Sequence, residues 1–251
     1  MIERSQQDDV TVLRMAHGKA SALDLEFLNG IRDAFVAERD ASDGAVVLTG
    51  SGRIFSAGVD LFRILREGRE YIEAFLPALD EMVLSIFDFP RPVVAAVNGH
   101  AIAGGCVLAC ACDHRLLVDG QATIGVPELR VGVPFPIIPL EMIERVLPRH
   151  RIEEVVWQGR TYDPASALEL GLVHELVASE QMQERALDVA RDLMTIPPSS
   201  FAATKERLHD RSHARFAAGG AASMKRMLEL WSSGEVTSAI QAYVDKTIKK
   251  S

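Results

Sequence analysis

The stretch Val93-Val94-Ala95-Ala96-Val97-Asn98-Gly99-His100-Ala101-Ile102-Ala103-Gly104-Gly105-Cys106 joins an apolar run to a glycine-bearing turn and then to a second apolar segment. Its first five residues are typical of a buried β-strand that ends at Asn98-Gly99. We expect a helix to begin near Gly104, with its first N–H groups and the positive end of its dipole exposed there. Because Gly104 has no side chain, an anionic oxygen can approach this backbone. The alternative is that the two glycines only permit close packing.

A second glycine-bearing segment lies upstream, Phe55-Ser56-Ala57-Gly58-Val59-Asp60-Leu61. This small-residue turn can direct the N–H of Val59 outward. Two such donors that converge on one point form an oxyanion hole, which stabilises the enolate or tetrahedral anion of a carbonyl compound. The two segments together therefore predict a class of chemistry before any substrate is considered.

Strand and helix patterns alternate around these segments. We expect strands at Val10–Met15, Ala45–Gly50, Val93–Val97, Leu116–Val118, Ala122–Ile124 and Leu172–Val177. We expect helices at Leu23–Glu38 and Tyr71–Phe89, and mainly helix from Glu180 onward. This order predicts an α/β fold with a helical C-terminal part.

The C-terminal part begins after Pro197-Pro198. Residues Met224–Ile248 have the apolar spacing of an amphipathic helix, and its apolar face needs a partner, either the body of the chain or a second subunit. The small residues Ala217–Ala222 are a candidate hinge.

The composition is that of an ordinary globular chain, with 251 residues, 48% hydrophobic and 25% charged. A net charge of -8, with no basic stripe apart from the short Lys249–Lys250 end, argues against a nucleic-acid partner. No stretch has the length and apolar character of a membrane span, and the N-terminus has no apolar leader. We therefore expect a soluble, cytoplasmic protein without a membrane partner.

Three cysteines lie close to a histidine, at Cys106, Cys110, Cys112 and His114. On a helix Cys112 would point away from the other two, and the spacing differs from the paired short spacings of structural zinc sites. We expect reduced, buried thiols and no metal.

These segments and several later ones resemble, in order and residue type, the crotonase (enoyl-CoA hydratase/isomerase) superfamily. The matching motifs are His17–Leu23, Phe55–Leu61, residues 92–105, Ala111–Arg115, Gly125–Leu129 and the run from Gly159-Arg160 through Ala165 and Ala167 to Gly171–Val173. The resemblance implies a crotonase-like spiral of repeated β-β-α units. It implies an acyl-CoA-binding core at residues 1–196 and a helical region at 197–251 for subunit contact and for covering the active site.

The resemblance also implies an active site. The backbone N–H groups of Val59 and Gly104 would hold the thioester oxygen of an acyl-CoA. The turn Ser56–Leu61, with Ala57, Asp60 and Leu61, would line the nucleotide end, where Asp60 is better explained as structural than as catalytic. Lys19 is a candidate contact for the CoA phosphates, and the alternative is a solvated loop lysine.

Hydratases of this family carry two glutamates, and this chain matches one of them. Glu128 follows Pro127 and is the candidate base, although an isolated glutamate there would also suit an exposed helix start. Val107 occupies the other position, where an apolar side chain can neither hold nor activate water. Phe135, in the rigid turn Val133–Pro139, is expected to narrow and dry the acyl pocket.

A single carboxylate suits proton shuttling better than water addition. We therefore expect an enzyme that shifts the double bond of a 3-enoyl-CoA to the 2-enoyl position, with Glu128 as the base. One alternative is a hydratase or another crotonase-type reaction that uses a relocated acid such as Glu73, Asp80 or Glu81. A further alternative is a non-catalytic acyl-CoA-binding subunit.

The resemblance implies no cofactor, because coenzyme A is part of the substrate. It implies a homotrimer or a dimer of trimers. The acyl chain is not specified by the residues.

Overall fold

The computed structural model describes residues 1–41 and 44–248, so the Lys249–Lys250 end lies outside the described residues. Within them, a six-stranded sheet has the order β1-β2-β4-β7-β9-β12. Its strands are β1 (Ile2–Gln7), β2 (Val10–Met15), β4 (Ala45–Thr49), β7 (Val93–Val97), β9 (His114–Val118) and β12 (Glu175–Val177). β1 is antiparallel to β2, and the other neighbouring pairs are parallel.

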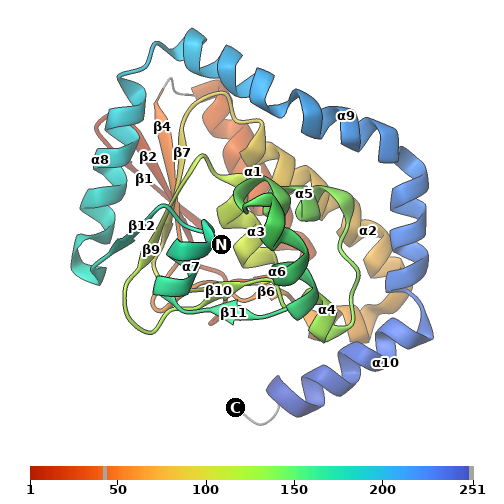
Figure 1. Cartoon of the computed structure of the whole chain (residues 1–251). Helices are drawn as coiled ribbons and strands as arrows, with labels where there is room; N and C mark the ends of the chain where they lie inside the picture. Colours follow the sequence, from red (N-terminus) through yellow and green to blue (C-terminus); the bar gives the residue numbers. More distant parts are fainter. Residues whose placement is uncertain (42–43, 249–251) are drawn as a thin grey trace.

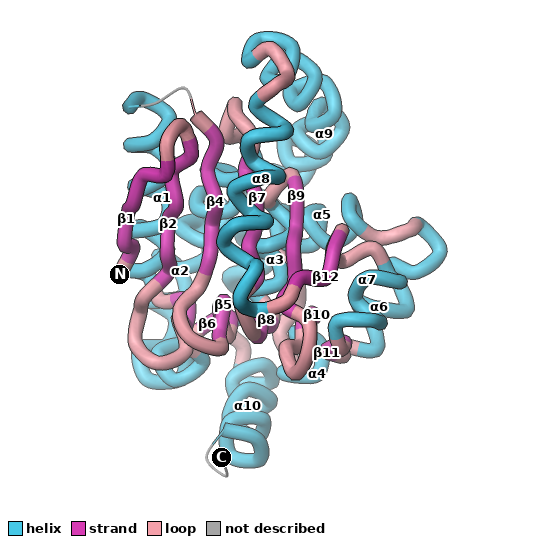
Figure 2. The backbone as a smooth tube through the Cα atoms, turned by 90° about the vertical axis from the view of Figure 1, so that its left-hand side faces the viewer, coloured by secondary structure: helices cyan, strands magenta, loops and turns pink. Residues whose placement is uncertain are grey.

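Helices cover both faces of this sheet, as Figure 2 shows. Helix α8 (Met182–Met194) lies on one face, and α1 (Leu25–Ala41), α2 (Leu61–Phe87) and α3 (Gly104–Ala111) lie on the other. Every residue of β7 is buried, which is expected for a central parallel strand covered on both sides.

Two smaller sheets bring the glycine-bearing segments together. One has the order β11-β10-β8-β5, and the other pairs β3 with β6. Their strands are β3 (Ala22–Leu23), β5 (Ile54–Ser56), β6 (Gly58–Val59), β8 (His100–Ile102), β10 (Ile124–Gly125) and β11 (Thr161–Tyr162). The unit of long strand, short strand and helix recurs as β7-β8-α3 and β9-β10-α4, and as β4-β5-β6-α2 with one extra short strand. This confirms the predicted α/β fold of repeated β-β-α units.

Short helices connect this core to the C-terminal region. They are α4 (Glu128–Val131), α5 (Ile137–Val146), α6 (Ile152–Gln158) and α7 (Pro164–Leu170), with 3₁₀ turns at Arg149–Arg151 and Ser179–Gln181. The chain then continues through α9 (Pro198–Trp231), α10 (Gly234–Tyr243) and a π-helical turn at Val244–Ile248. Figure 1 shows α9 arching over the outside of α2 and α5, and α10 lying apart from the sheet.

The predicted single helix over Met224–Ile248 is wrong. The chain breaks after Trp231, and Ser233 caps the next helix by accepting a hydrogen bond from the Val236 N–H at 3.2 Å. The chain bends within the predicted hinge segment, since α9 is interrupted at the non-helical Gly220, whose φ is 43°.

Helix α2 is longer than the predicted Tyr71–Phe89. It begins at Leu61 because Asp60 caps it, and a non-helical Gly68 interrupts the apolar spacing on which the prediction rested. The strand expected at Ala122–Ile124 is reduced to Ile124–Gly125, and the strand expected at Leu172–Val177 begins only at Glu175. In the part of the chain that the structure describes, no helix has the length and apolar character needed to cross a membrane.

We expect Gly105→Ala to destabilise the fold by about 1–3 kcal/mol, the usual range for forcing a methyl group into a packed interior. A Cβ at this position would lie 3.0 Å from the carbonyl carbon of Ser56, and closer still to its oxygen, and this backbone cannot move cheaply. Urea unfolding measures the change. The matched control is Gly234→Ala, whose added Cβ meets no atom within 4 Å, and a change there within about 0.5 kcal/mol is expected. Equal stability of Gly105→Ala and the native chain would contradict the close approach.

Candidate active site

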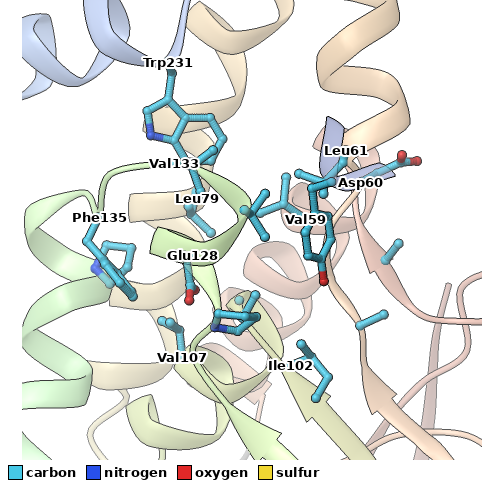
Figure 3. Close-up of a pocket in the computed structure, with 18 of the residues that line it drawn as sticks. Val59, Asp60, Leu61, Leu79, Ile102, Val107, Glu128, Val133, Phe135 and Trp231 are labelled. Atoms are coloured by element: carbon cyan, nitrogen blue, oxygen red, sulfur yellow. The ribbon is translucent and has the colours of Figure 1, made fainter. Parts of the chain in front are cut away.

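A largely apolar cavity of about 290 Å³ lies between β6, the start of α3, α4 and the C-terminal helices. Its walls come from segments far apart in the sequence, including Leu79 of α2, Ile102 of β8 and Trp231 at the end of α9. Figure 3 shows these side chains around the cavity together with Glu128. An apolar cavity with few polar groups is the usual form of a small-molecule site.

The two glycine-bearing segments meet at one wall of this cavity. Gly58 has a φ of 82°, and a Cβ added there would lie 2.7 Å from the carbonyl oxygen of Ile102 and 3.1 Å from the nitrogen of Gly104. A Cβ added to Gly104 would lie 3.7 Å from Gly58 Cα. Only glycine permits this approach at Gly58, so the two segments lie side by side at the cavity wall. The convergence of their N–H groups stays a prediction.

Backbone strain precedes the helix that contributes one of the two predicted donors. Ala103, the N-cap of α3, has a φ of 52°, and its N–H donates to the carbonyl oxygen of Gly125 at 2.8 Å. Its side chain makes no capping hydrogen bond. As the first residue of the helix, Gly104 has no intrahelical acceptor for its N–H. Strained non-glycine backbone of this kind is concentrated at functional sites.

Hydrogen bonds on both sides of Val59 hold the other predicted donor in place. The Gly58 N–H donates to Ser56 Oγ at 3.2 Å, and Ser56 Oγ donates to the carbonyl oxygen of Ser21 at 2.8 Å. The Asp60 N–H donates to the carbonyl oxygen of Leu23 at 3.0 Å. Val59 lines the cavity between these anchors, beside Gly104.

The remaining residues of the predicted nucleotide-binding turn divide into two groups. Ala57, Asp60 and Leu61 line the cavity, whereas Ser56 is buried behind it. Asp60 also has the predicted structural role, because its Oδ1 accepts the N–H groups of residues 62 and 63 at the start of α2. Lys19 is exposed and does not line the cavity, although the neighbouring Ala20 does.

Glu128 stands at the start of α4, directly after Pro127, and its carboxyl group faces the cavity (Figure 3). The residue as a whole is only partly buried, but its Oε2 is shielded and has no hydrogen-bond partner. Burial raises the pKa of Glu128 to about 8. The predicted apolar surroundings are thus present, and near neutral pH the carboxyl group exists mainly as the neutral acid.

Val107 lines the same cavity one turn into α3 and is 1% exposed. It offers no polar atom opposite Glu128. The carboxylates considered as relocated acids do not line the cavity: Glu73 pairs with Arg69, Glu81 pairs with Arg32, and Asp80 is buried elsewhere on α2. Burial raises the pKa of Asp80 to about 7. Among the described residues, two carboxylates therefore line the cavity, Asp60 and Glu128. Asp60 caps α2, whereas Glu128 caps no helix.

The lining residues that were not predicted as site residues include two from the C-terminal helices, Trp231 and Tyr243. Trp231 is 2% exposed and donates from Nε1 to the carbonyl oxygen of Pro134 at 3.0 Å, which attaches the end of α9 to the turn that carries Phe135. Tyr243 lines the cavity from the end of α10. Both belong to the apolar pattern of Met224–Ile248. The sequence left open what this apolar face packs against, and that open question was the signal that could have pointed to these residues. Phe135 lines the cavity as expected.

A family model described as enoyl-CoA hydratase/isomerase matches residues 5–250. The chain is 27% identical over 249 residues to a human protein named enoyl-CoA delta isomerase 1, mitochondrial, covering 98% of this chain and 82% of that protein. It is 33% identical over 190 residues to a carnitinyl-CoA dehydratase of Salmonella typhi, covering 75% and 72%. A crystal structure of human mitochondrial Δ3-Δ2-enoyl-CoA isomerase superposes with a TM-score of 0.95 at 26% identity, covering 99% of this chain and 98% of that one.

The raised pKa of Glu128 predicts how stability depends on pH. The native carboxyl group keeps its proton up to about pH 8, whereas the unfolded one loses it near 4.5, so the native state binds more protons between these values. Native stability should therefore fall as pH rises through this window. The side chain in Glu128→Gln does not titrate. The variant and the native chain should therefore have a similar free energy of unfolding at about pH 4, and the variant should be the more stable of the two above about pH 8.

Urea unfolding at a series of pH values measures this difference. Each unit of pKa shift corresponds to at most about 1.4 kcal/mol. Glu73→Gln, an exposed carboxylate on α2, is the matched control and should show no such gain at high pH. A pH-independent difference between Glu128→Gln and the native chain would contradict the buried, protonated state.

Proposed function

The chain belongs to the enoyl-CoA hydratase/isomerase family, and from this premise we propose that it moves the double bond of a 3-enoyl-CoA to the 2-enoyl position. The observation that carries the proposal is Glu128, whose shielded Oε2 has no hydrogen-bond partner, in an apolar cavity that Val59 and Gly104 also line. This arrangement supplies one base and one anion-stabilising site, which are the two elements that a proton shuttle next to a thioester requires.

Substrate binding places the thioester oxygen at the Val59 and Gly104 N–H groups. In this position the start of α3 contributes both an N–H donor and the positive end of its dipole. As a proton leaves C2, negative charge develops on the thioester oxygen, and the hydrogen bonds strengthen at that stage. Each donor of this kind contributes about 3–4 kcal/mol to the transition state in enzymes where it has been removed.

Glu128 moves the proton. Its ionised carboxylate takes a proton from C2, and the electrons of that C–H bond become the enolate held at the backbone donors. The neutral acid then returns the proton to C4. The electron pair of the former C3–C4 double bond forms the new C4–H bond, and the enolate closes to a double bond between C2 and C3. The burial that raises the pKa of Glu128 to about 8 makes its carboxylate a stronger base than an exposed one.

The walls around Glu128 favour proton transfer over water addition. Val107 presents no polar atom to position a water molecule, and Phe135 and Trp231 add apolar surface on the other side. Coenzyme A is part of the proposed substrate, and the proposal needs no separate cofactor.

We also propose assembly as a homotrimer or a dimer of trimers. Large apolar side chains remain exposed on the isolated chain, with Trp157 at 67% and Leu208 at 66%, and they offer surface for subunit contacts.

Hydration or dehydration of an acyl-CoA is a second candidate. The relative that is 33% identical is named a dehydratase. Tyr243 also lines the cavity and has a hydroxyl group that can exchange a proton. In this case Tyr243 would supply the second proton-transfer group in place of the glutamate that Val107 replaces.

A paired assay tests these candidates. The purified chain receives a 3-enoyl-CoA to measure double-bond migration, and a trans-2-enoyl-CoA to measure water addition. We expect migration with little hydration, and Glu128→Gln should reduce the migration kcat by about 100-fold or more while CoA-ester binding is retained. Glu73→Gln is the control and should keep the native rate.

Other outcomes assign the alternatives. Efficient hydration that Tyr243→Phe abolishes would support the second candidate over the isomerase. Binding of both thioesters without turnover of either would indicate a non-catalytic acyl-CoA-binding subunit. Native activity in Glu128→Gln would exclude Glu128 as the base.

The pH dependence of migration follows from the same carboxyl group. Because the base must be ionised, kcat/KM should rise with pH along a limb whose apparent pKa is about 8, the value that burial gives Glu128 in the free protein. Initial rates at low substrate concentration between about pH 6 and 9 measure this limb. A limb near the ordinary glutamate pKa would show that the carboxylate is solvated in the working enzyme.

A further inference from the structure

Far from the cavity, three side chains with metal-binding atoms come together where α9 crosses the end of α2. Asp88 is the C-cap of α2, and His209 and His213 lie four residues apart on α9. One ligand atom from each of the three lies within 4.8 Å of the other two. Because residues four apart share one face of a helix, both imidazoles face Asp88.

The distances between these atoms are close to those around a bound metal. His213 Nε2 lies 2.9 Å from Asp88 Oδ1, and His209 Nδ1 lies 3.7 Å from the same oxygen. Ligand atoms of a tetrahedral Zn²⁺ site are about 3.3 Å apart, as bond lengths of about 2.0–2.2 Å require. Small side-chain rotations would therefore complete three coordination positions.

The inner imidazole is already held in place. His209 is 5% exposed and stacks on Phe87 with ring centroids 3.5 Å apart and planes 8° apart. Phe87 directly precedes Asp88, whose N–H donates to the carbonyl oxygen of Leu84 at 2.9 Å. The stacking and burial fix the orientation of the ring toward Asp88.

Two cations lie near the group, and one of them is paired with a carboxylate. Lys205, one turn before His209, forms an ion pair with Asp113 at 2.7 Å. Arg145 lies over the Phe87 ring at 4.8 Å from its centroid and donates to the carbonyl oxygen of Leu208 at 3.2 Å. His213 is 46% exposed, so a metal ion and a fourth ligand from solvent have access.

We propose that Asp88, His209 and His213 bind one Zn²⁺ ion, which joins α9 to the end of α2. Two imidazoles and one carboxylate suit Zn²⁺, whereas Mg²⁺ and Ca²⁺ require mainly oxygen ligands. The ion would act structurally, because the site lies away from Glu128 and its three residues do not line that cavity. Helix α9 also carries the cavity-lining Trp231, at its far end. The inference does not depend on the proposed isomerase activity.

Titration of the purified chain without a histidine tag tests the site. Isothermal calorimetry with Zn²⁺ should give one site per chain, and Co²⁺ should give the visible absorption of a tetrahedral nitrogen and oxygen site. His213→Ala removes an exposed ligand without creating a cavity and should weaken Zn²⁺ binding by at least about 100-fold, since loss of even a supporting residue costs about 10–100-fold. Asp88→Asn should weaken it as well.

The control is His150→Ala, an exposed histidine outside the group, which should bind Zn²⁺ as the native chain does. Zn²⁺ should raise the Tm of the native chain and of His150→Ala, and leave that of His213→Ala unchanged. Absence of Zn²⁺ binding by the native chain would overturn the proposal and leave a hydrogen-bonded helix contact. Undiminished binding by His213→Ala, or a thiolate absorption band with Co²⁺, would place the metal elsewhere and also overturn it.

Discussion

The contact between two backbones at Gly58 and Gly104 is the constraint on which the rest of the structure depends. Side chains on β6 and on the start of α3 would hold these segments apart, because a Cβ at Gly58 would lie 2.7 Å from the carbonyl oxygen of Ile102. The same requirement recurs at Gly105 against Ser56. The unit that ends in α2 and the unit that ends in α3 must therefore pack in one register, and that register places Val59 beside the start of α3. The geometry of the site follows from this packing of the two units.

The position of Glu128 opposes stability and serves the proposed chemistry. Oε2 of Glu128 is shielded in an apolar cavity and has no hydrogen-bond partner to replace its lost hydration, so burial favours the neutral form of the carboxyl group. Other buried polar groups are partnered, as when Glu38 accepts hydrogen bonds from Arg4 and Thr11. Asp80, His114 and Ser232 also have a buried polar atom without a partner, but of these four residues only Glu128 lines the cavity. A perturbed carboxyl group inside a cavity is a candidate for function, because it is otherwise a cost to the fold.

Local sequence predicted those features that depend on a few consecutive residues. The strand Val93–Val97, the helix start at Gly104 and the bend among Ala217–Ala222 each follow from apolar spacing or from the backbone freedom of glycine. The placement of Val107 and Glu128 around one cavity agrees with what the family resemblance implied. Trp231 and Tyr243 could not be assigned this way, because their position depends on the path of α9 and on the break after Trp231. The group of Asp88, His209 and His213 could not be predicted for the same reason, since 120 residues lie between Asp88 and His209 along the chain.

Helix α9 makes different contacts before and after its bend at Gly220. Of its 34 residues, Lys205, His209, Ser212 and Trp231 are buried. The first three lie before the bend at Gly220 and make polar contacts to the core, including the 2.8 Å hydrogen bond from Ser212 Oγ to Glu141. Trp231 alone anchors the part beyond the bend by deep burial. Gly220 has open space around it, and its φ of 43° is a conformation that glycine adopts at little cost. The bend therefore lets the second half of α9 turn toward the cavity, where Trp231 joins its wall, while the first half stays packed on α2 and α5.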